Sequence, residues 1–261
     1  MQSNFAANTD VIRDRLVERA KNNGSAPWPV EFPGATDEAL KLLIDLERYP
    51  HAYVIGCLMD RLWPAERVWP IPYALKQRLG TFEIRNLAEL QVEDFLKVMK
   101  IPSPLHWLTE TMGNVVFLAV QRILSNYNGD ASKIWSGTPS SASIVNHFWG
   151  FHGAGQKIAT MATNILVRKF RIPVSDRYSI DISVDTHIKR VFTRLGFVPE
   201  DASNDQIIFR AREMYPEYPG IFDLPVWELG RNSCCAVIPN CMDCYLADIC
   251  PSHSENSTMG G

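Results

Sequence analysis

The sequence predicts an all-α protein, and two observations support that prediction. Apolar residues recur at helical spacing in one segment after another, with Gly, Pro, Asn or Asp between the segments. Long alternation of β-branched and polar residues, which would indicate strands, is absent from the sequence. With 261 residues and 46% hydrophobic content, the chain is long enough to form one large helical domain or two modest ones.

The expected helices follow one another along the chain. Thr9 or Asp10 is expected to cap the first helix, and Asp37 opens the second. In the segment 50–62, helical spacing places apolar residues as far as Leu62 on a mostly buried stripe. Further helices are expected at 64–79, 87–99, 106–127, 140–149, 155–170, 184–195 and 204–214.

The composition limits the classes of function. No apolar run reaches the roughly 20 residues that a membrane-spanning helix needs, and the N-terminus lacks the basic-then-apolar order of a secretory signal. We therefore expect a soluble intracellular protein without a membrane partner. Since the formal net charge is −3, a nucleic-acid binder of this composition must gather its positive charge on one face.

Five of the six cysteines lie close together near the end of the sequence. Cys234, Cys241, Cys244 and Cys250 are separated by six, two and five residues. Four thiolates suit either a zinc ion or a [4Fe–4S] cluster. Zinc sites usually offer two tight Cys-x-x-Cys turns, whereas this segment has one, so the spacing favours a larger cluster. Cys235 is expected to pack nearby, and zinc or disulfides remain as alternatives.

This spacing resembles the iron–sulfur loop of endonuclease III-like DNA glycosylases, the helix-hairpin-helix group with a Gly/Pro-rich loop and a catalytic Asp. Two upstream segments are also similar to the family: FWGFHGAGQKIATMATNIL at 148–166 and VDTH at 184–187. The resemblance implies a [4Fe–4S] cluster as cofactor and double-stranded DNA containing a damaged, mismatched or modified base as partner. It also implies a monomer in the cytoplasm, nucleoid-associated if the source is bacterial or archaeal.

The hairpin segment contains the first set of candidate site residues. Gly153, Ala154, Gly155 and Gln156 form a tight turn and begin a helix, whose first backbone N–H groups can bind a DNA phosphate. An ordinary Gly-containing turn between helices is the alternative. Lys157 matches the family's nucleophilic lysine, which forms a Schiff base with the sugar C1′. A phosphate-contacting or solvated lysine is the alternative at that position.

The second set of candidates lies in the VDTH segment and in one upstream loop. Asp185 matches the catalytic carboxylate and, as the residue before Thr186, is also expected to cap a helix. His187 and Lys189 are assigned to DNA binding, with a packing role as the alternative for His187. Arg61 lies near the position where the family fills the gap left by a flipped base, and a surface ion pair with its neighbour is the alternative.

Two further segments depart from the family. The loop KIPSPLHWLTETMGN offers Leu105, His106 and Trp107 as residues that could wedge between bases, with core packing as the alternative. The interval between Lys157 and Asp185 is longer than usual. Its extra material, at 167–181, contains four basic residues, Arg168, Lys169, Arg171 and Arg177. We interpret it as a loop that contacts the DNA backbone, with a merely solvated loop as the alternative.

The resemblance implies two helical lobes with a DNA-binding cleft, a helix-hairpin-helix motif and an iron–sulfur loop. The expected division is 1–47 (helices that pack with the cluster lobe), 48–173 (helical bundle), 174–250 (iron–sulfur domain) and 251–261 (flexible tail). The implied function is base-excision repair, in which the enzyme flips and excises a damaged or modified base and cleaves the abasic site as a lyase. Two alternatives are a monofunctional glycosylase and a non-catalytic iron–sulfur protein that binds DNA.

Overall fold

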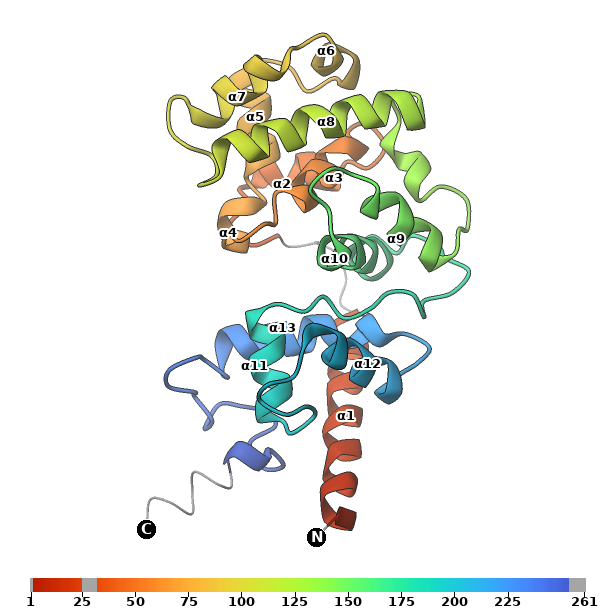
Figure 1. Ribbon diagram of the computed structural model, residues 1–261, viewed down its shortest axis with the longest axis vertical. Coiled ribbons are helices and arrows are strands. Elements are labelled where there is room, and N and C mark those ends of the chain that lie inside the picture. Colours follow the sequence, from red (N-terminus) through yellow and green to blue (C-terminus); the bar gives the residue numbers. More distant parts are fainter. Residues whose placement is uncertain (1, 25–31, 254–261) are drawn as a thin grey trace. The chain divides into compact units, whose positions relative to one another are not determined.

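The regular secondary structure of the chain is helical. The computed structural model describes residues 2–24 and 32–253, and within these ranges no strand occurs (Figure 1). The all-α prediction is therefore confirmed. Across the same residues, no helix combines the length and the hydropathy needed to cross a membrane.

The chain divides into two compact units, one formed by Trp28–Ser175 and the other by Met1–Pro27 together with Asp176–Gly261. The described helices of the first unit are α2 (Asp37–Ile44), α3 (Pro50–Leu58), α4 (Ala65–Val68), α5 (Ile71–Leu79), α6 (Ile84–Ala88), α7 (Val92–Lys100), α8 (Thr109–Tyr127), η1 (Ala131–Ile134), α9 (Ser141–Trp149) and α10 (Gln156–Arg168). Those of the second unit are α1 (Gln2–Gly24), α11 (Thr186–Arg194), α12 (Asn204–Met214), η2 (Pro219–Phe222) and α13 (Asp223–Asn232).

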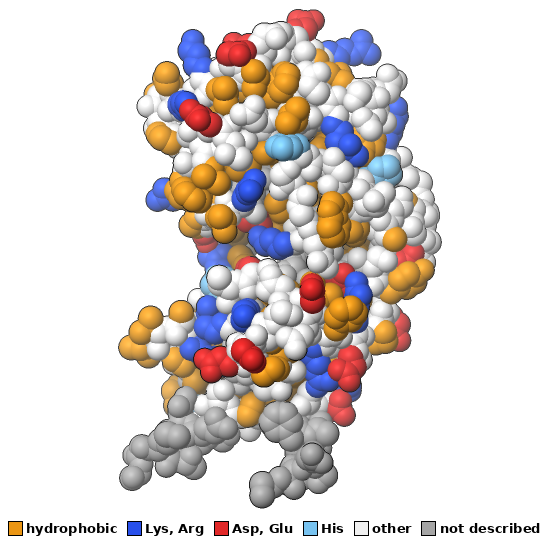
Figure 2. Space-filling view, viewed as in Figure 1, with side chains coloured by type: hydrophobic (Ala, Val, Ile, Leu, Met, Phe, Trp, Pro, Cys, Tyr) orange, Lys and Arg blue, Asp and Glu red, His pale blue; other side chains and the backbone are white. Residues whose placement is uncertain are grey.

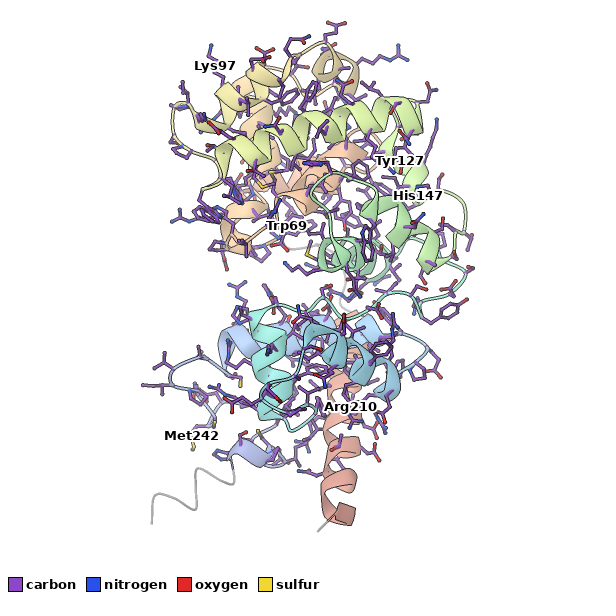
Figure 3. All side chains as sticks on the ribbon, viewed as in Figure 1. Trp69, Lys97, Tyr127, His147, Arg210 and Met242 are labelled. Carbon is purple, nitrogen blue, oxygen red and sulfur yellow. The ribbon has the colours of Figure 1, made fainter. Side chains whose placement is uncertain are left out.

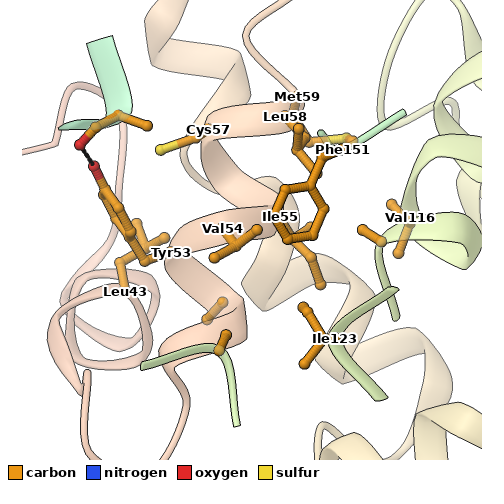
Figure 4. Packing of buried hydrophobic residues seen from close by; sticks show 14 of the residues in the cluster. Leu43, Tyr53, Val54, Ile55, Cys57, Leu58, Met59, Val116, Ile123 and Phe151 are labelled. Atoms are coloured by element: carbon orange, nitrogen blue, oxygen red, sulfur yellow. Dashed lines mark hydrogen bonds between the residues drawn. The ribbon is translucent and has the colours of Figure 1, made fainter. Parts of the chain in front are cut away.

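Helix α3 is the centre of the 28–175 unit. Each of its nine residues is buried, and it packs against α2, α5, α8, α10 and η1. Figure 4 shows its apolar side chains, among them Val54 and Ile55, packed against Val116 and Ile123. The Tyr53 hydroxyl is fully buried and donates a hydrogen bond of 2.6 Å to the carbonyl of Ala162, which ties α3 to α10 (Figure 4).

Several helix boundaries differ from the predicted ones. The segment 50–62 leaves the helix after Leu58, and Leu62 is 79% exposed with a left-handed backbone (φ 55°) instead of lying on the buried stripe. The segment 64–79 forms two helices because Pro70 starts a new one. The segment 87–99 is divided between α6 and α7 because Gln91 forms a capping box at the start of α7.

The N-terminal region is divided differently from the prediction for residues 1–47. Helix α1 already includes Thr9 and Asp10 in its interior, and it packs on α13 and η2 within its own unit. Helix α2, however, packs on α3 and α5 in the 28–175 unit. The reason is that Leu42 and Leu43 bury their side chains in the core around α3. Of the predicted tail, residues 254–261 lie outside the described residues, while the Ser252 hydroxyl donates to the Arg194 carbonyl at 2.7 Å.

We expect Tyr53→Phe to lower the free energy of unfolding by about 1 kcal/mol, because it removes a hydrogen bond from a fully buried site. Tyr178, which is 59% exposed, provides the matched control, and Tyr178→Phe should change stability by less than about 0.5 kcal/mol. Denaturant unfolding of the two variants measures the difference. Equal stabilities would contradict a contribution from the bond to Ala162.

Candidate functional site

The predicted hairpin connects α9 to α10. Gly153 has φ +85°, a backbone conformation that favours glycine, and Ala154 N–H donates to the Phe151 carbonyl at 3.0 Å to close the turn. Gly155 occupies the N-cap position of α10, where no side chain caps the helix. A Cβ added at Gly155 would meet no atom within 4 Å, so another molecule can approach the start of α10 closely.

The hairpin rests on aromatic side chains. The Phe151 ring stacks on Tyr127 at 6.2 Å between centroids. The Arg122 guanidinium lies over the Phe151 ring, 5.2 Å from its centroid. The Tyr127 hydroxyl and His147 Nδ1 are 2.9 Å apart, and both residues are labelled in Figure 3. Burial, followed by the charge of Arg122, lowers the pKa of His147. These contacts fix the turn that precedes α10.

Lys157 forms an ion pair that the sequence does not reveal. Its Nζ lies 2.6 Å from Oδ2 of Asp60, and the two side chains are 37% and 16% exposed, respectively. Asp60 follows the C-terminal end of α3, so the pair joins two elements of the same unit. From the sequence, Asp60 was expected only as the neighbour that could form a surface ion pair with Arg61. No local pattern could indicate a contact between residues 97 positions apart.

The loop of residues 60–63 presents Leu62 to solvent. The Trp107 indole N–H donates to the Leu62 carbonyl at 3.1 Å, and Trp107 itself is 52% exposed. His106 is fully buried, and burial lowers its pKa. The hydrogen bond from Trp107 joins the loop of residues 60–63 to the loop that contains Trp107, a contact that was not predicted from the sequence. Leu62 and Trp107 are both exposed, while the buried His106 packs against Trp63 at 5.4 Å between ring centroids.

Arg61 lies next to the hairpin. Its Nη1 is 4.0 Å from the point that a Cβ of Gly153 would occupy, and Val115 Cγ2 is 3.0 Å from the same point. Gly153 therefore has a second constraint besides its backbone conformation, because the Val115 side chain of α8 would have to shift to admit a Cβ. Arg61 and the predicted Gly153–Gln156 turn thus belong to one local surface, together with Lys157 and Asp60.

Asp185 is the N-cap residue of α11 in the other unit. Its Oδ1 accepts a hydrogen bond of 2.8 Å from Ile188 N–H, as the VDTH segment predicts for a cap. The residues just before Asp185 are buried and form hydrogen bonds with Arg212 and Asp223. Asp181 pairs with Arg212 through two bonds of 2.7 and 2.8 Å, and Asp223 accepts from the Ser183 N–H at 2.8 Å. These contacts fix the carboxylate of Asp185 at the start of the helix.

His187 and Lys189 also lie on α11, and both are half-buried. His187 Nδ1 accepts a hydrogen bond of 3.0 Å from Arg190. The helix packs against α13 so closely that a Cβ at Gly230 would lie 2.7 Å from His187 Cβ. His187 thus has packing and hydrogen-bonding contacts, which was the alternative considered for it, and nothing in these contacts bears on DNA.

The cysteine loop is held by arginines of α11. Arg190 donates to the Cys234 carbonyl at 2.9 Å, and Arg194 donates to the Cys235 carbonyl at 2.6 Å. Arg194 Nη1 also lies 3.3 Å from Cys234 Sγ. Both arginines therefore bind the loop. The loop carries exposed apolar side chains at Val237, Ile238 and Met242, of which Met242 is labelled in Figure 3.

The donor chemistry of the loop fits a metal cluster. Cys234, Cys241, Cys244 and Cys250 are half-buried free thiols. Burial is the main cause that raises the pKa of Cys244, and the thiols of Cys250, Cys234 and Cys241 raise it as well. Cys235 Sγ instead lies 3.7 Å from the Arg231 carbonyl. Within the described ranges, no three His, Cys, Asp or Glu side chains converge as a site for a metal ion.

The four basic residues of 167–181 have mixed surroundings. Lys169 lies over the Phe32 ring at 5.2 Å, and Arg177 lies over the Tyr218 ring at 5.5 Å. Arg171 has a left-handed backbone (φ 54°), and Arg168 ends α10. In the single view of Figure 2, basic side chains lie among acidic and apolar ones.

Comparison with solved structures identifies the fold. A trapped covalent endonuclease III–DNA intermediate aligns with 85% of this chain and 94% of its own at a TM-score of 0.61 and 19% identity. A thermostable thymine-DNA glycosylase aligns with 96% and 98% at a TM-score of 0.63 and 13% identity. The chain has the endonuclease III fold.

A third structure with this fold is the 8-oxoguanine glycosylase/lyase of Clostridium acetobutylicum in complex with DNA. It aligns with 86% of this chain and 68% of its own, at a TM-score of 0.55 and 15% identity. No protein-family model and no curated protein matches the sequence. The endonuclease III fold is therefore established by structure, and the site residues rest on the contacts of this chain alone.

We expect Asp185→Ala to lower the free energy of unfolding by about 1 kcal/mol, because α11 loses its cap. Asp185→Asn should cost less, since the amide oxygen can still accept from Ile188 N–H. Asp201→Ala, at an exposed position, serves as the control. If denaturant unfolding gave Asp185→Ala and Asp185→Asn the same stability, the capping role would be wrong.

Proposed function

We propose that this protein is a base-excision DNA glycosylase that also cleaves the resulting abasic site as a lyase. The observation that carries the proposal is Lys157. Lys157 is the second residue of α10, the helix that follows the hairpin. The fold is shared with endonuclease III, which has been solved as a trapped covalent intermediate with DNA. Lysine is a suitable nucleophile for the sugar C1′ because its amine can form a Schiff base.

The chemistry assigns one role to each of two side chains. The Lys157 amine gives up a proton to solvent and attacks C1′ of the flipped nucleotide, while the bond from C1′ to the base breaks and the base leaves with its electron pair. Loss of another N–H proton to solvent and opening of the C1′–O4′ bond, with O4′ protonated, then give the Schiff base. The carboxylate of Asp185 stabilises the positive charge that develops on the sugar, for which its fixed position as a helix cap is suited. Loss of a C2′ proton from the Schiff base then expels the 3′ phosphate by β-elimination.

DNA binding is proposed for the hairpin and for the loop of residues 60–63. The uncapped start of α10, preceded by Gly153, Ala154 and Gly155, can donate backbone N–H groups to a phosphate. Base flipping leaves a gap in the duplex, and an apolar residue can fill it. We assign Leu62 to that position, with Arg61 beside it, because Leu62 is 79% exposed and its carbonyl is fixed by Trp107.

A [4Fe–4S] cluster is proposed for the cysteine loop, with Cys234, Cys241, Cys244 and Cys250 as the ligands. Four thiols at six–two–five spacing support it. If bound, such a cluster would hold the loop in a fixed shape. Arg194, whose guanidinium lies 3.3 Å from Cys234 Sγ, would balance part of the negative charge of the thiolates.

Borohydride reduction in the presence of duplex DNA with an abasic site should trap a covalent adduct with the wild-type protein. Lys157→Ala should form none, because the amine is gone, whereas Lys133→Ala, at an exposed position on η1, should trap as the wild type does. Gel separation of the adducts measures both. Undiminished trapping by Lys157→Ala would disprove the assignment, and base release without strand cleavage would indicate a monofunctional glycosylase.

The protein purified without oxygen should be brown and contain iron. Cys244→Ser should lower both the bound iron and the visible absorption, because a proposed ligand is lost, while Cys235→Ser should retain them. Iron analysis and visible spectroscopy provide the measurement. A colourless protein that contains zinc would refute the cluster and restore the zinc alternative.

A further inference from the structure

The ion pair between Asp60 and Lys157 joins the proposed nucleophile to a loop that no sequence motif connects with it. Lys157 Nζ and Asp60 Oδ2 are 2.6 Å apart, a short distance that is typical of a charge-assisted hydrogen bond. Both residues belong to the 28–175 unit, so the contact is internal to one compact body.

Asp60 is held rigidly on its own side of the pair. It follows a helix of which each residue is buried, and its N–H donates to the Cys57 carbonyl at 3.1 Å. The next N–H, of Arg61, donates to the Met59 carbonyl at 2.7 Å. Because the N–H groups of Asp60 and Arg61 are both hydrogen-bonded, the Asp60 side chain extends toward the amine from a fixed backbone position.

The surroundings distinguish this pair from an ordinary surface ion pair. Lys100 and Glu110 lie at a similar distance, 2.7 Å, but their side chains are 45% and 75% exposed. Solvent and salt screen such pairs, so they contribute little. Asp60 is only 16% exposed, and its charge is therefore less screened where it meets Lys157.

Asp60 and Arg61 contact the hairpin at two neighbouring places. The Asp60 carboxylate holds Lys157 at the start of α10, and Arg61 Nη1 lies 4.0 Å from the point where a Cβ of Gly153 would sit. The exposed Leu62 follows directly. The loop that presents Leu62 and the amine of Lys157 are therefore linked through one pair of consecutive residues.

We propose that Asp60 is a positioning residue that directs the Lys157 amine for attack. A lysine side chain is long and flexible, and an attacking group is effective only when it is held near its target in the right orientation. The carboxylate removes that freedom by binding Nζ beside the hairpin. The proposal rests on the proposed function, because it supposes that Lys157 forms the Schiff base.

Single-turnover trapping with borohydride on abasic-site duplex DNA tests the proposal. Asp60→Ala should slow trapping about tenfold to a hundredfold, because the amine is no longer directed. Asp60→Asn should lose less, since its amide oxygen still accepts a hydrogen bond from Nζ. The affinity for the same DNA should stay within about threefold in both variants, a split that general loss of structure would not produce.

Glu110→Gln is the matched control, because it breaks the exposed pair with Lys100 and should trap at the wild-type rate. Wild-type or faster trapping by Asp60→Ala would overturn the positioning role. So would a parallel loss of DNA affinity, since it would indicate a structural defect.

A second measurement needs no DNA chemistry. Reductive methylation of the DNA-free protein, resolved by mass spectrometry, should label Lys157 severalfold faster in Asp60→Ala than in the wild type, with Lys100 unchanged. Unchanged labelling of Lys157 would overturn the contact itself. The two proposals can fail separately. If the wild-type protein traps no DNA, the lyase function is refuted. If Lys157 is still labelled faster in Asp60→Ala, the contact between Asp60 and Lys157 stands.

Discussion

The complete burial of helix α3 is the constraint on which the larger unit depends. A helix with no solvent-facing residue must be covered on every side, and α2, α5, α8, α10 and η1 provide that cover. Its C-terminal end is then fixed as well, so the residues that leave it start from a rigid base. Asp60 and Leu62 owe their positions to this helix, although neither belongs to it.

Much of the fold was predictable because amphipathic periodicity is local. The helices at 140–149, 155–170 and 204–214 were predicted to within a few residues, since Ser140 and Ser203 cap two of them and the hairpin glycines precede the third. The end of α3 was not predicted. Leu62 continues the apolar spacing, but the helix ends at Leu58 and Leu62 itself has a left-handed backbone.

Some features of the candidate site depend on neighbouring residues in the sequence, and others depend on residues that are far apart in it. The cap at Asp185 and the turn before Lys157 depend on neighbouring residues and were visible in the sequence. The partner of Lys157 lies 97 positions away, and the arginine that approaches Cys234 Sγ lies 40 positions away. Charged residues carry no periodic signal, so their pairing could be recognised only after the helices were placed.

Helix α11 contacts two candidate functional features, one at each of its ends. Asp185 caps its first turn, and Arg194, at its last residue, binds the cysteine loop. Nine residues at 1.5 Å each make a rod of about 13 Å, short enough to transmit a tilt from one end to the other. A change in the shape of the cysteine loop would thus tilt α11 through Arg194 and shift the carboxylate of Asp185.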